Sequence, residues 1–201
     1  HELNFEVEED MIQLETVVIS ANKNETNRLE APIVVHVMTP KLFENTNSVC
    51  LAQGLSFQPG LRVETNCQNC GFQQVRINGL DGPYTQLLLD GKALFSSLNG
   101  VYGIEQIPTG MIERVEVMRG GGSALYGANA IGGTVNIITK EPLNNLFMIS
   151  HNLTAIGNSA YDNTTSLNTS LVNSQRDAGI YLFGTSRHRQ NDVHYGDNFS
   201  E

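Results

Sequence analysis

Tryptophan is absent from this chain of 201 residues, and charged side chains are scarce, at 16% of the total. A typical soluble domain has about 25% charged residues. Asn, Ser, Thr, Gln and Gly supply the missing polarity, a mixture that suits turns and strand surfaces better than helix interiors. The composition therefore favours an all-β or loop-rich structure over a helix bundle.

Basic residues and long apolar runs are also lacking. Only 12 Lys and Arg stand against 21 Asp and Glu, which gives a net charge of −9. Nucleic-acid binding depends on basic side chains that neutralise phosphates, so the charge argues against it. No run approaches the ~20 apolar residues of a membrane-spanning helix, which excludes a helical span. A transmembrane β-barrel remains compatible with the sequence, because its strands carry a much weaker hydrophobicity signal than a helix.

The chain has three cysteines, Cys50, Cys67 and Cys70, and the last two form a single C-x-x-C motif. A zinc site needs a second pair or histidines at ligand spacing, so no metal site is predicted. The motif lies among Asn, Gln and Gly, unlike a thioredoxin-type motif at a helix start. We expect a local Cys67–Cys70 disulfide in an oxidising compartment, with reduced thiols as the alternative. Cys50 lies in an apolar helical pattern and is expected in the core.

A glycine-rich stretch, RGGGSALYGANAIGGTVNIITK, occupies residues 119–140. It is not a P-loop, because no Lys follows Gly127 or Gly132. It is not a dinucleotide fingerprint either, because Leu125 stands where the third glycine is required. No nucleophile–base pair or close carboxylate pair stands out in the sequence, so no catalytic residue and no enzyme activity is predicted.

Residues 31–141 alternate short apolar runs with turn residues, which predicts a compact α+β unit. A short helix is expected from Asn47 or Ser48 to Leu55, and Asp90–Gly91 is a hairpin-type turn signal. Pro40 is interpreted as the stop of the strand before it. Strands are expected at 33–38, 61–64, 73–79, 85–94, 112–120 and 133–140.

The composition changes at 141–145, and three strand-like stretches follow at 147–157, 164–172 and 178–187. Leu167 and Leu171 share one face of the second stretch, while small polar residues occupy the other. His151 interrupts the apolar face of the first stretch. One apolar and one small-polar face over about ten residues is typical of an outer-membrane barrel wall. A soluble meander is the weaker alternative, because its core face would need more large apolar residues.

The glycine-rich stretch resembles the plug-domain signature of TonB-dependent outer-membrane receptors. The matching positions are Arg119-Gly120, Ser123, Tyr126-Gly127, Ala130, Gly132-Gly133, Asn136-Ile137 and Thr139-Lys140. The preceding IPTGMIERVEVMRG also fits, as does VRINGL followed by LLLDG. The resemblance covers Leu14 to Lys140, with its motifs in the family's order.

This resemblance implies a fold class: an α+β plug domain, with a short mixed sheet, small helices and long loops, followed by the first antiparallel strands of a transmembrane β-barrel. The domains would be a flexible N-terminal segment at 1–30, the plug at 31–141 and the barrel strands at 142–201. LETVVIS at 14–20 resembles the TonB box, a run that can add as a strand to a partner's sheet. An ordinary edge strand of the plug is the alternative. The implied TonB-binding residues are Glu15, Thr16, Val17, Val18, Ile19 and Ser20.

The resemblance also implies a bacterial outer-membrane transporter for haem, a corrinoid or a siderophore-type complex, without an intrinsic cofactor. Its partners would be TonB with its inner-membrane motor, the rest of the barrel, outer-membrane lipid and a surface lipoprotein. Arg114, Glu116 and Arg119 are candidates for ion pairs with the barrel wall. Substrate would meet upper loops at the C-x-x-C motif, at 79–84 and at 95–102. The candidate substrate-binding residues are Cys67, Cys70, Phe72, Asp81, Tyr84, Phe95 and Tyr102. The alternative function is a soluble or secreted ligand-binding domain of plug fold without transport.

Overall fold

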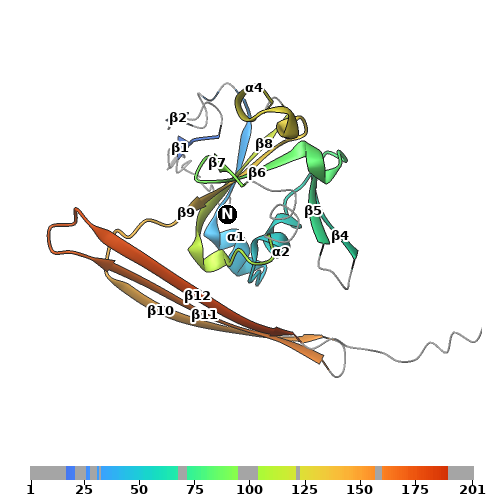
Figure 1. The fold of residues 1–201 in the computed structure, drawn as a ribbon. Helices are drawn as coiled ribbons and strands as arrows, with labels where there is room; N and C mark the ends of the chain where they lie inside the picture. The colour runs from blue at the N-terminus through green and yellow to red at the C-terminus, as the bar shows by residue number, and fades with distance from the viewer. Residues whose placement is uncertain are drawn as a thin grey trace, which may run out of the picture.

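Two separate sheets dominate the fold. The computed structural model describes residues 17–20, 26–27, 31, 33–67, 72–94, 104–120, 123–156 and 160–189. Within these ranges the structure has a five-stranded sheet, here called the plug sheet, and a three-stranded sheet, here called the wall sheet (Figure 1). Two further strand pairs form small sheets of their own.

The plug sheet is mixed, as predicted. Its strands lie in the order β3 (Val35–Met38), β8 (Ile112–Arg119), β9 (Gly133–Thr139), β6 (Thr85–Leu89) and β7 (Lys92–Ala93). Strands β6 and β9 are parallel, and the other neighbours are antiparallel. Asp90 and Gly91 both have positive φ, 48° and 76°, which is the backbone of a type I′ hairpin turn. The predicted hairpin signal is therefore confirmed.

Two short helices, α1 (Pro40–Asn45) and α2 (Leu51–Leu55), cover the face of the plug sheet that looks toward the wall sheet (Figure 1). The main core lies between them and the sheet, and its members include Phe43, Leu51, Leu55, Val115, Val117, Val135 and Ile137. The sequence analysis missed α1, because Pro40 stops the strand but also begins a helix, where its missing N–H costs nothing. Helix α2 begins later than predicted and ends at Leu55 as predicted.

The remaining elements connect or flank the plug sheet. Strands β4 (Leu61–Cys67) and β5 (Phe72–Ile77) form an antiparallel pair, and β1 (Val17–Val18) pairs with β2 (Thr26–Asn27). The short helical turns are η1 (Gly82–Tyr84), η2 (Thr109–Met111), α4 (Ser123–Tyr126) and η3 (Ala128–Ala130).

Gly133, the last glycine of the glycine-rich stretch, shows what such a glycine does. Its φ is +139°, and a Cβ there would lie 2.2 Å from the carbonyl oxygen of Met118. A side chain would therefore block the approach of β9 to β8, so this glycine serves backbone packing.

The wall sheet consists of β10 (Leu146–Ile156), β11 (Ala160–Val172) and β12 (Gly179–Arg189), paired antiparallel in chain order. The three predicted strands are confirmed, although β11 begins four residues before the predicted 164. A turn at 174–177 joins β11 to β12.

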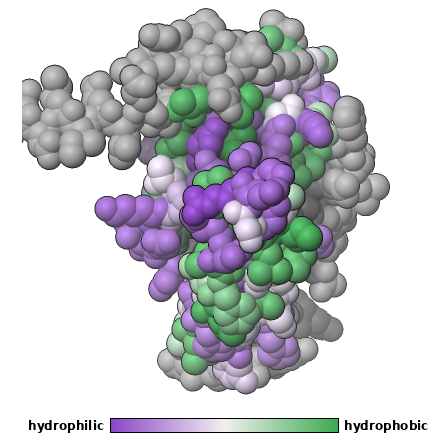
Figure 2. All heavy atoms as spheres, turned by 90° about the vertical axis from the view of Figure 1, so that its left-hand side faces the viewer, coloured by the Kyte–Doolittle hydropathy of each residue, from purple (hydrophilic) through white to green (hydrophobic). Residues whose placement is uncertain are grey.

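The two faces of the wall sheet differ in polarity, as the alternation predicts. Large apolar side chains are exposed on the face turned away from the plug sheet: Phe147, Ile149, Leu153, Leu167, Leu171, Ile180 and Leu182. The other face of β11 buries polar side chains: Asp162, Thr164, Asn168 and Ser170. Hydrophobic surface gathers over the lower part of the molecule, where the wall sheet lies (Figure 2). None of the helices in the described part of the chain is long and apolar enough to cross a membrane.

Candidate functional site

The face of the plug sheet away from the helices carries a buried carboxylate. Val115 and Val117 on β8 point into the main core, so Glu116 between them points to the opposite face. Glu116 is 0% exposed and lies in register with Val37 of β3 on one side and Asn136 of β9 on the other. A buried carboxylate is costly unless charged or hydrogen-bonding groups surround it.

The N-terminal segment supplies those groups. Oε2 of Glu116 accepts hydrogen bonds from the backbone N–H of Ile19 at 2.9 Å, the backbone N–H of Ser20 at 2.8 Å and Ser20 Oγ at 2.7 Å. Oε1 accepts from Nε of Arg114 at 2.9 Å. Hydrogen bonds to an ionised acceptor are about twice as strong as neutral ones. Glu116 therefore fixes residues 19–20 on the sheet.

Ser20 is also bound to two further elements. Asn136 Nδ2 on β9 donates to Ser20 Oγ at 3.1 Å, and the hydroxyl of Tyr126 in α4 donates to the carbonyl oxygen of Ser20 at 3.1 Å. Burial raises the pKa of Tyr126, and the negative charge of Glu116 raises it further. The hydroxyl consequently stays protonated and able to donate.

An apolar contact completes the docking of the segment. Val18 is 0% exposed and packs against Val35, with Ala31 and Val37 at the edge of the cluster. Of the six predicted TonB-binding residues, Val18, Ile19 and Ser20 are thus seen docked on the plug sheet, while Val17 pairs with Asn27 of β2. Glu15 and Thr16 lie outside the described residues.

Among the described residues, Arg114, Glu116 and Arg119 form no ion pair with the wall sheet, so pairs with the rest of a barrel stay a prediction. Arg114 pairs with Glu113 and Glu116, and Arg119 donates to the carbonyl oxygen of Pro59. Sequence reasoning singled out Glu116 but not its partner, because Ser20 is 96 positions away and no local pattern links them.

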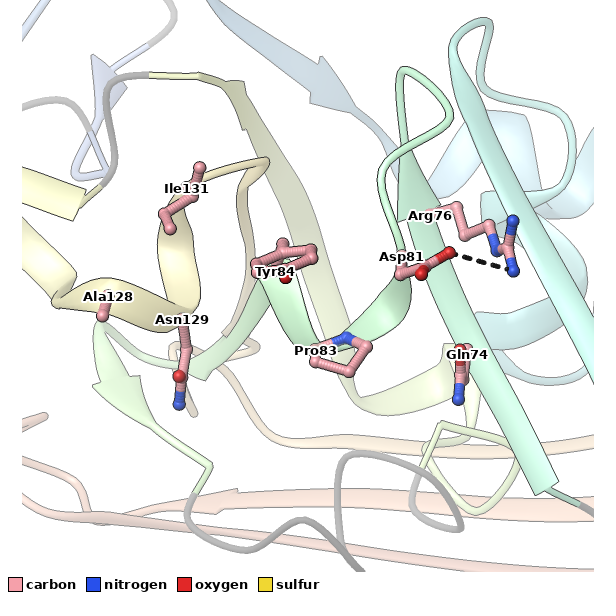
Figure 3. Close-up of a pocket in the computed structure, with 8 residues that line it drawn as sticks. All are labelled: Gln74, Arg76, Asp81, Pro83, Tyr84, Ala128, Asn129 and Ile131. Atoms are coloured by element: carbon pink, nitrogen blue, oxygen red, sulfur yellow. Dashed lines mark ion pairs between the residues drawn. The ribbon is translucent and has the colours of Figure 1, made fainter.

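A cavity of about 450 Å³ opens beside η1 and η3 (Figure 3). Nη2 of Arg76 on β5 lies 3.1 Å from Oδ1 of Asp81, and its Nε lies 2.7 Å from Oε2 of Glu64. The ring of Tyr84 lies between Pro83 and the residues of η3 (Figure 3). The lining residues are Gln74, Arg76, Asp81, Pro83, Tyr84, Ala128, Asn129 and Ile131.

Two of the predicted substrate-binding residues lie together at this cavity. Asp81 and Tyr84 line this cavity, next to Gly132, whose N–H bonds to the Tyr84 carbonyl. Cys67 and Phe72 pair at the first residue of β5, two residues before Gln74, whose side chain lines the cavity and lies next to Gly82 of η1. The turn at 79–84 follows the last residue of β5 and folds back alongside the strand, beside Gln74.

Three predicted residues, Cys70, Phe95 and Tyr102, lie outside the described residues, and so does the predicted Cys67–Cys70 disulfide. Cys50 is buried as expected and carries a free thiol. Burial raises the pKa of that thiol.

The plug and the wall meet at Gly110 in η2. Its carbonyl oxygen accepts hydrogen bonds from Nζ of Lys140 at 3.0 Å and from the hydroxyl of Tyr181 on β12 at 3.1 Å. A Cβ on Gly110 would lie 2.7 Å from Nδ2 of Asn168 on β11. The wall sheet thus touches the plug through its polar face, at a position where only glycine fits without displacement.

Comparison with known proteins shows which family the chain matches. Residues 27–134, just over half of the chain, match the family described as the TonB-dependent receptor plug domain. The vitamin B12 transporter BtuB of Vibrio vulnificus is 35% identical over 127 residues, covering 63% of this chain and 21% of that protein.

Solved structures also resemble the chain. The siderophore receptor PirA from Acinetobacter baumannii matches with a TM-score of 0.62 at 25% identity, covering 77% of this chain and 24% of that one. A variant of the ferric enterobactin receptor PfeA from Pseudomonas aeruginosa matches with a TM-score of 0.59 at 27% identity, covering 78% and 25%. The chain spans roughly a fifth to a quarter of the length of these relatives.

Proposed function

The chain belongs to the TonB-dependent receptor plug domain family, and from that premise we propose that it is the plug and the first wall strands of an outer-membrane transporter. The transporter imports a scarce metal complex through a plugged β-barrel, driven by TonB. In this proposal residues 1–30 carry the TonB box, residues 31–141 form the plug, and residues 142–201 begin the barrel.

The polarity of the wall sheet is the observation that carries this proposal. A soluble antiparallel sheet packs its apolar face on a core and turns its polar face to water. Here Ile149 and Leu182 are 62% and 58% exposed, while Asp162 and Asn168 are buried toward the plug. That inversion suits a strand between lipid and a polar barrel interior. In water the same face would be a large exposed apolar patch.

The wall also requires further strands. Among the described residues, β10 and β12 are the outer strands of the three-stranded wall sheet. Open sheet edges are not tolerated in lipid, so the rest of the barrel must pair with them. The remaining strands would come from the rest of the receptor, since plugged transporters have about 22 strands.

The proposed substrate class is a corrinoid. It rests on the 35% identity to a vitamin B12 transporter, which exceeds the 25–27% identity to two receptors for siderophores. A ferric siderophore is the second candidate and haem the third. The complex would contact the upper plug loops, and the proposed residues are Cys67, Cys70, Phe72, Asp81, Tyr84, Phe95 and Tyr102. A surface lipoprotein that delivers the complex remains a proposed partner.

The decisive experiment is uptake of radiolabelled cyanocobalamin by cells that express the full-length receptor, with and without TonB. We expect TonB-dependent uptake, with the receptor in the outer-membrane fraction. Uptake of a ferric siderophore instead would identify the second candidate as the substrate. A receptor that binds ligand but fractionates as a soluble protein would favour the non-transporting alternative.

The TonB box assignment has its own test. Pro at position 17 removes a backbone N–H and fixes φ, so Val17→Pro should block strand addition to TonB. We expect uptake to be abolished while substrate binding at the cell surface is unchanged. Val17→Thr keeps the N–H and the β-branched side chain and serves as the control. Normal uptake by the Pro variant would count against the assignment.

A further inference from the structure

A row of polar side chains crosses the outward face of the wall sheet, the face turned away from the plug sheet (Figure 1). His151 of β10 lies opposite Thr165 of β11, and Thr165 lies opposite Ser186 of β12. Their alternation with Ile149 and Leu182 puts all three on the outward face, where they are exposed. Nδ1 of His151 and Oγ1 of Thr165 are joined by a hydrogen bond of 3.0 Å. The row is thus continuous across the three strands.

A second polar pair lies directly beyond this row. Asn163 of β11 is opposite His188 of β12, again on the outward face. We call His151, Asn163, Thr165, Ser186 and His188 the polar patch. It contains no Lys, Arg, Asp or Glu. Among the described residues, the Ser186 hydroxyl and the His188 ring make no hydrogen bond, so the patch has free donors and acceptors.

Outward aromatic side chains mark the depth of the patch in a membrane. Phe147 and Tyr161 are 67% and 42% exposed, and Tyr161 lies opposite Ala155 of β10. From 147 to 155 the strand advances about 27 Å, or about 20 Å in depth at a tilt of ~40°. Aromatic girdles bound an apolar band about 25 Å tall in outer-membrane barrels. Because His151 is midway between positions 147 and 155, its row lies near the membrane midplane.

Hydrocarbon is an unsuitable environment for the polar patch. Polar groups at that depth have no water to bond with, and lipid headgroups do not reach the midplane. Ionisable side chains within the membrane are rare, and they face protein or a water-filled cavity. The patch faces neither the plug nor the barrel interior, which indicates that another protein covers it.

The chemistry of the patch selects the kind of protein. A matching surface must offer uncharged donors and acceptors at the same depth in the membrane. A second copy related by a two-fold axis along the membrane normal meets this condition, because each residue then recurs at its own depth. Gly184 on β12 adjoins the patch, and no atom lies within 4 Å of the position that a Cβ would take there. A second wall can therefore approach β12 closely beside Ser186.

We infer that the polar patch is a contact between two copies of the receptor in the outer membrane, centred on Ser186 and His188. The inference rests on the proposed function, because it requires the outward face of the wall sheet to lie in lipid. The contact is on the face opposite the plug. Each copy therefore keeps its own transport path, and uptake per receptor does not depend on pairing.

The first test counts copies by single-molecule photobleaching of the full-length receptor, with one dye on each copy, in phosphatidylcholine bilayers. We expect two bleaching steps for the wild type. Replacing both central residues, Ser186→Leu with His188→Leu, suits the face to lipid and should weaken pairing at least about tenfold. Ile180→Val is the matched control, on the same strand and face but outside the patch. Heat-modifiable migration on gels checks that each variant is folded.

Single-step bleaching of the wild type would overturn the inference, and so would two-step bleaching that persists in the double Leu variant. Absence of the receptor from the outer-membrane fraction would instead refute the proposed function. A receptor that fractionates with the outer membrane and imports its substrate but bleaches in one step leaves the proposed function intact.

The second test identifies the neighbour in cells by oxidising membranes that contain the full-length Ser186→Cys receptor. We expect a disulfide-linked receptor dimer on non-reducing gels. Ile180→Cys, roughly 20 Å away along β12, should give at least about fivefold less dimer, because a disulfide needs closely spaced Cα atoms. Equal dimer yields at the two positions would indicate random collision and contradict the inference. A cross-link from position 186 to a different protein would contradict it as well.

Discussion

The plug sheet and the wall sheet bury opposite kinds of side chain. On the plug sheet, Val115 and Ile137 are fully buried under the helices. On the wall sheet, Asn168 is buried toward the plug while Leu182 points outward. Both sheets are built from strands with a period of two, so the alternation alone does not say which face is inside. The solvent on the outward side of a sheet decides which face is buried. Water favours burial of the apolar face, and lipid favours burial of the polar face.

The largest effect should follow from a charge in the plug core. Ile137→Asp places an unpaired carboxylate at a position that is 0% exposed, which neither the helices nor the neighbouring strands can neutralise. We expect no folded receptor in the outer membrane, measured by heat-modifiable migration on gels. Ile137→Val, which removes one methylene, should cost only about 0.5–1.5 kcal/mol and fold normally. Normal assembly of the Asp variant would mean that this face of the plug sheet is not a core.

A charge on the outer face of the wall sheet should cost less but still be measurable. In lipid, Leu182→Arg should lower the free energy of unfolding by about 2–4 kcal/mol near the membrane midplane. In water, the same change at a position 58% exposed would stay within about 0.5 kcal/mol. Urea titration of the receptor folded in bilayers measures the difference, with Leu182→Ile as the control. A change below about 0.5 kcal/mol would remove the distinction between the two sheets.

The inward face of the wall sheet carries an ion pair that should contribute more to the free energy of unfolding than an ion pair on the plug surface. Nη2 of Arg187 lies 2.5 Å from Oδ2 of Asp162, and both side chains are largely buried. Asp162→Asn should cost about 1–3 kcal/mol, because the guanidinium loses its charged acceptor. Glu113→Gln breaks a pair whose carboxylate is half exposed and should cost less than about 1 kcal/mol. Equal costs in the urea titration would show that the inward face of the wall sheet is as accessible to water as the surface of the plug.

The smallest effect should be at the contact between the two sheets. Gly110→Ala pushes Asn168 aside and should cost about 1 kcal/mol. Asn168→Ser, which shortens the displaced side chain, should restore most of that loss in the double variant. Lack of rescue would mean that the cost comes from the η2 backbone and not from the contact between plug and wall.

Local patterns were sufficient for much of this fold. The hairpin at Asp90–Gly91 follows from residues that accept positive φ, and the faces of β11 follow from its alternation. Helix α1 was missed because Pro40 both ends a strand and begins a helix, and a single sequence signal cannot separate the two.

The candidate site depended on long-range pairing, which a single sequence does not encode locally. Glu116 was picked out as a candidate for an ion pair with the barrel wall, but its partner Ser20 comes from the N-terminal segment. Asp81 and Tyr84 were grouped with the C-x-x-C motif, but their contact with the side of β5 at Gln74 has no local signal in the sequence. Residue types were therefore predictable, and their neighbours were not.

The most direct test of the central claim is fluorescence quenching of a tryptophan on the wall sheet by brominated lipid. Ile149→Trp places the probe on the outward face of β10, and Asn168→Trp places it on the inward face of β11. Each signal is taken as the difference from the unsubstituted full-length receptor in the same bilayers. Our account predicts strong quenching at position 149 and little at position 168. Equal quenching at the two positions, or none at 149, would contradict it.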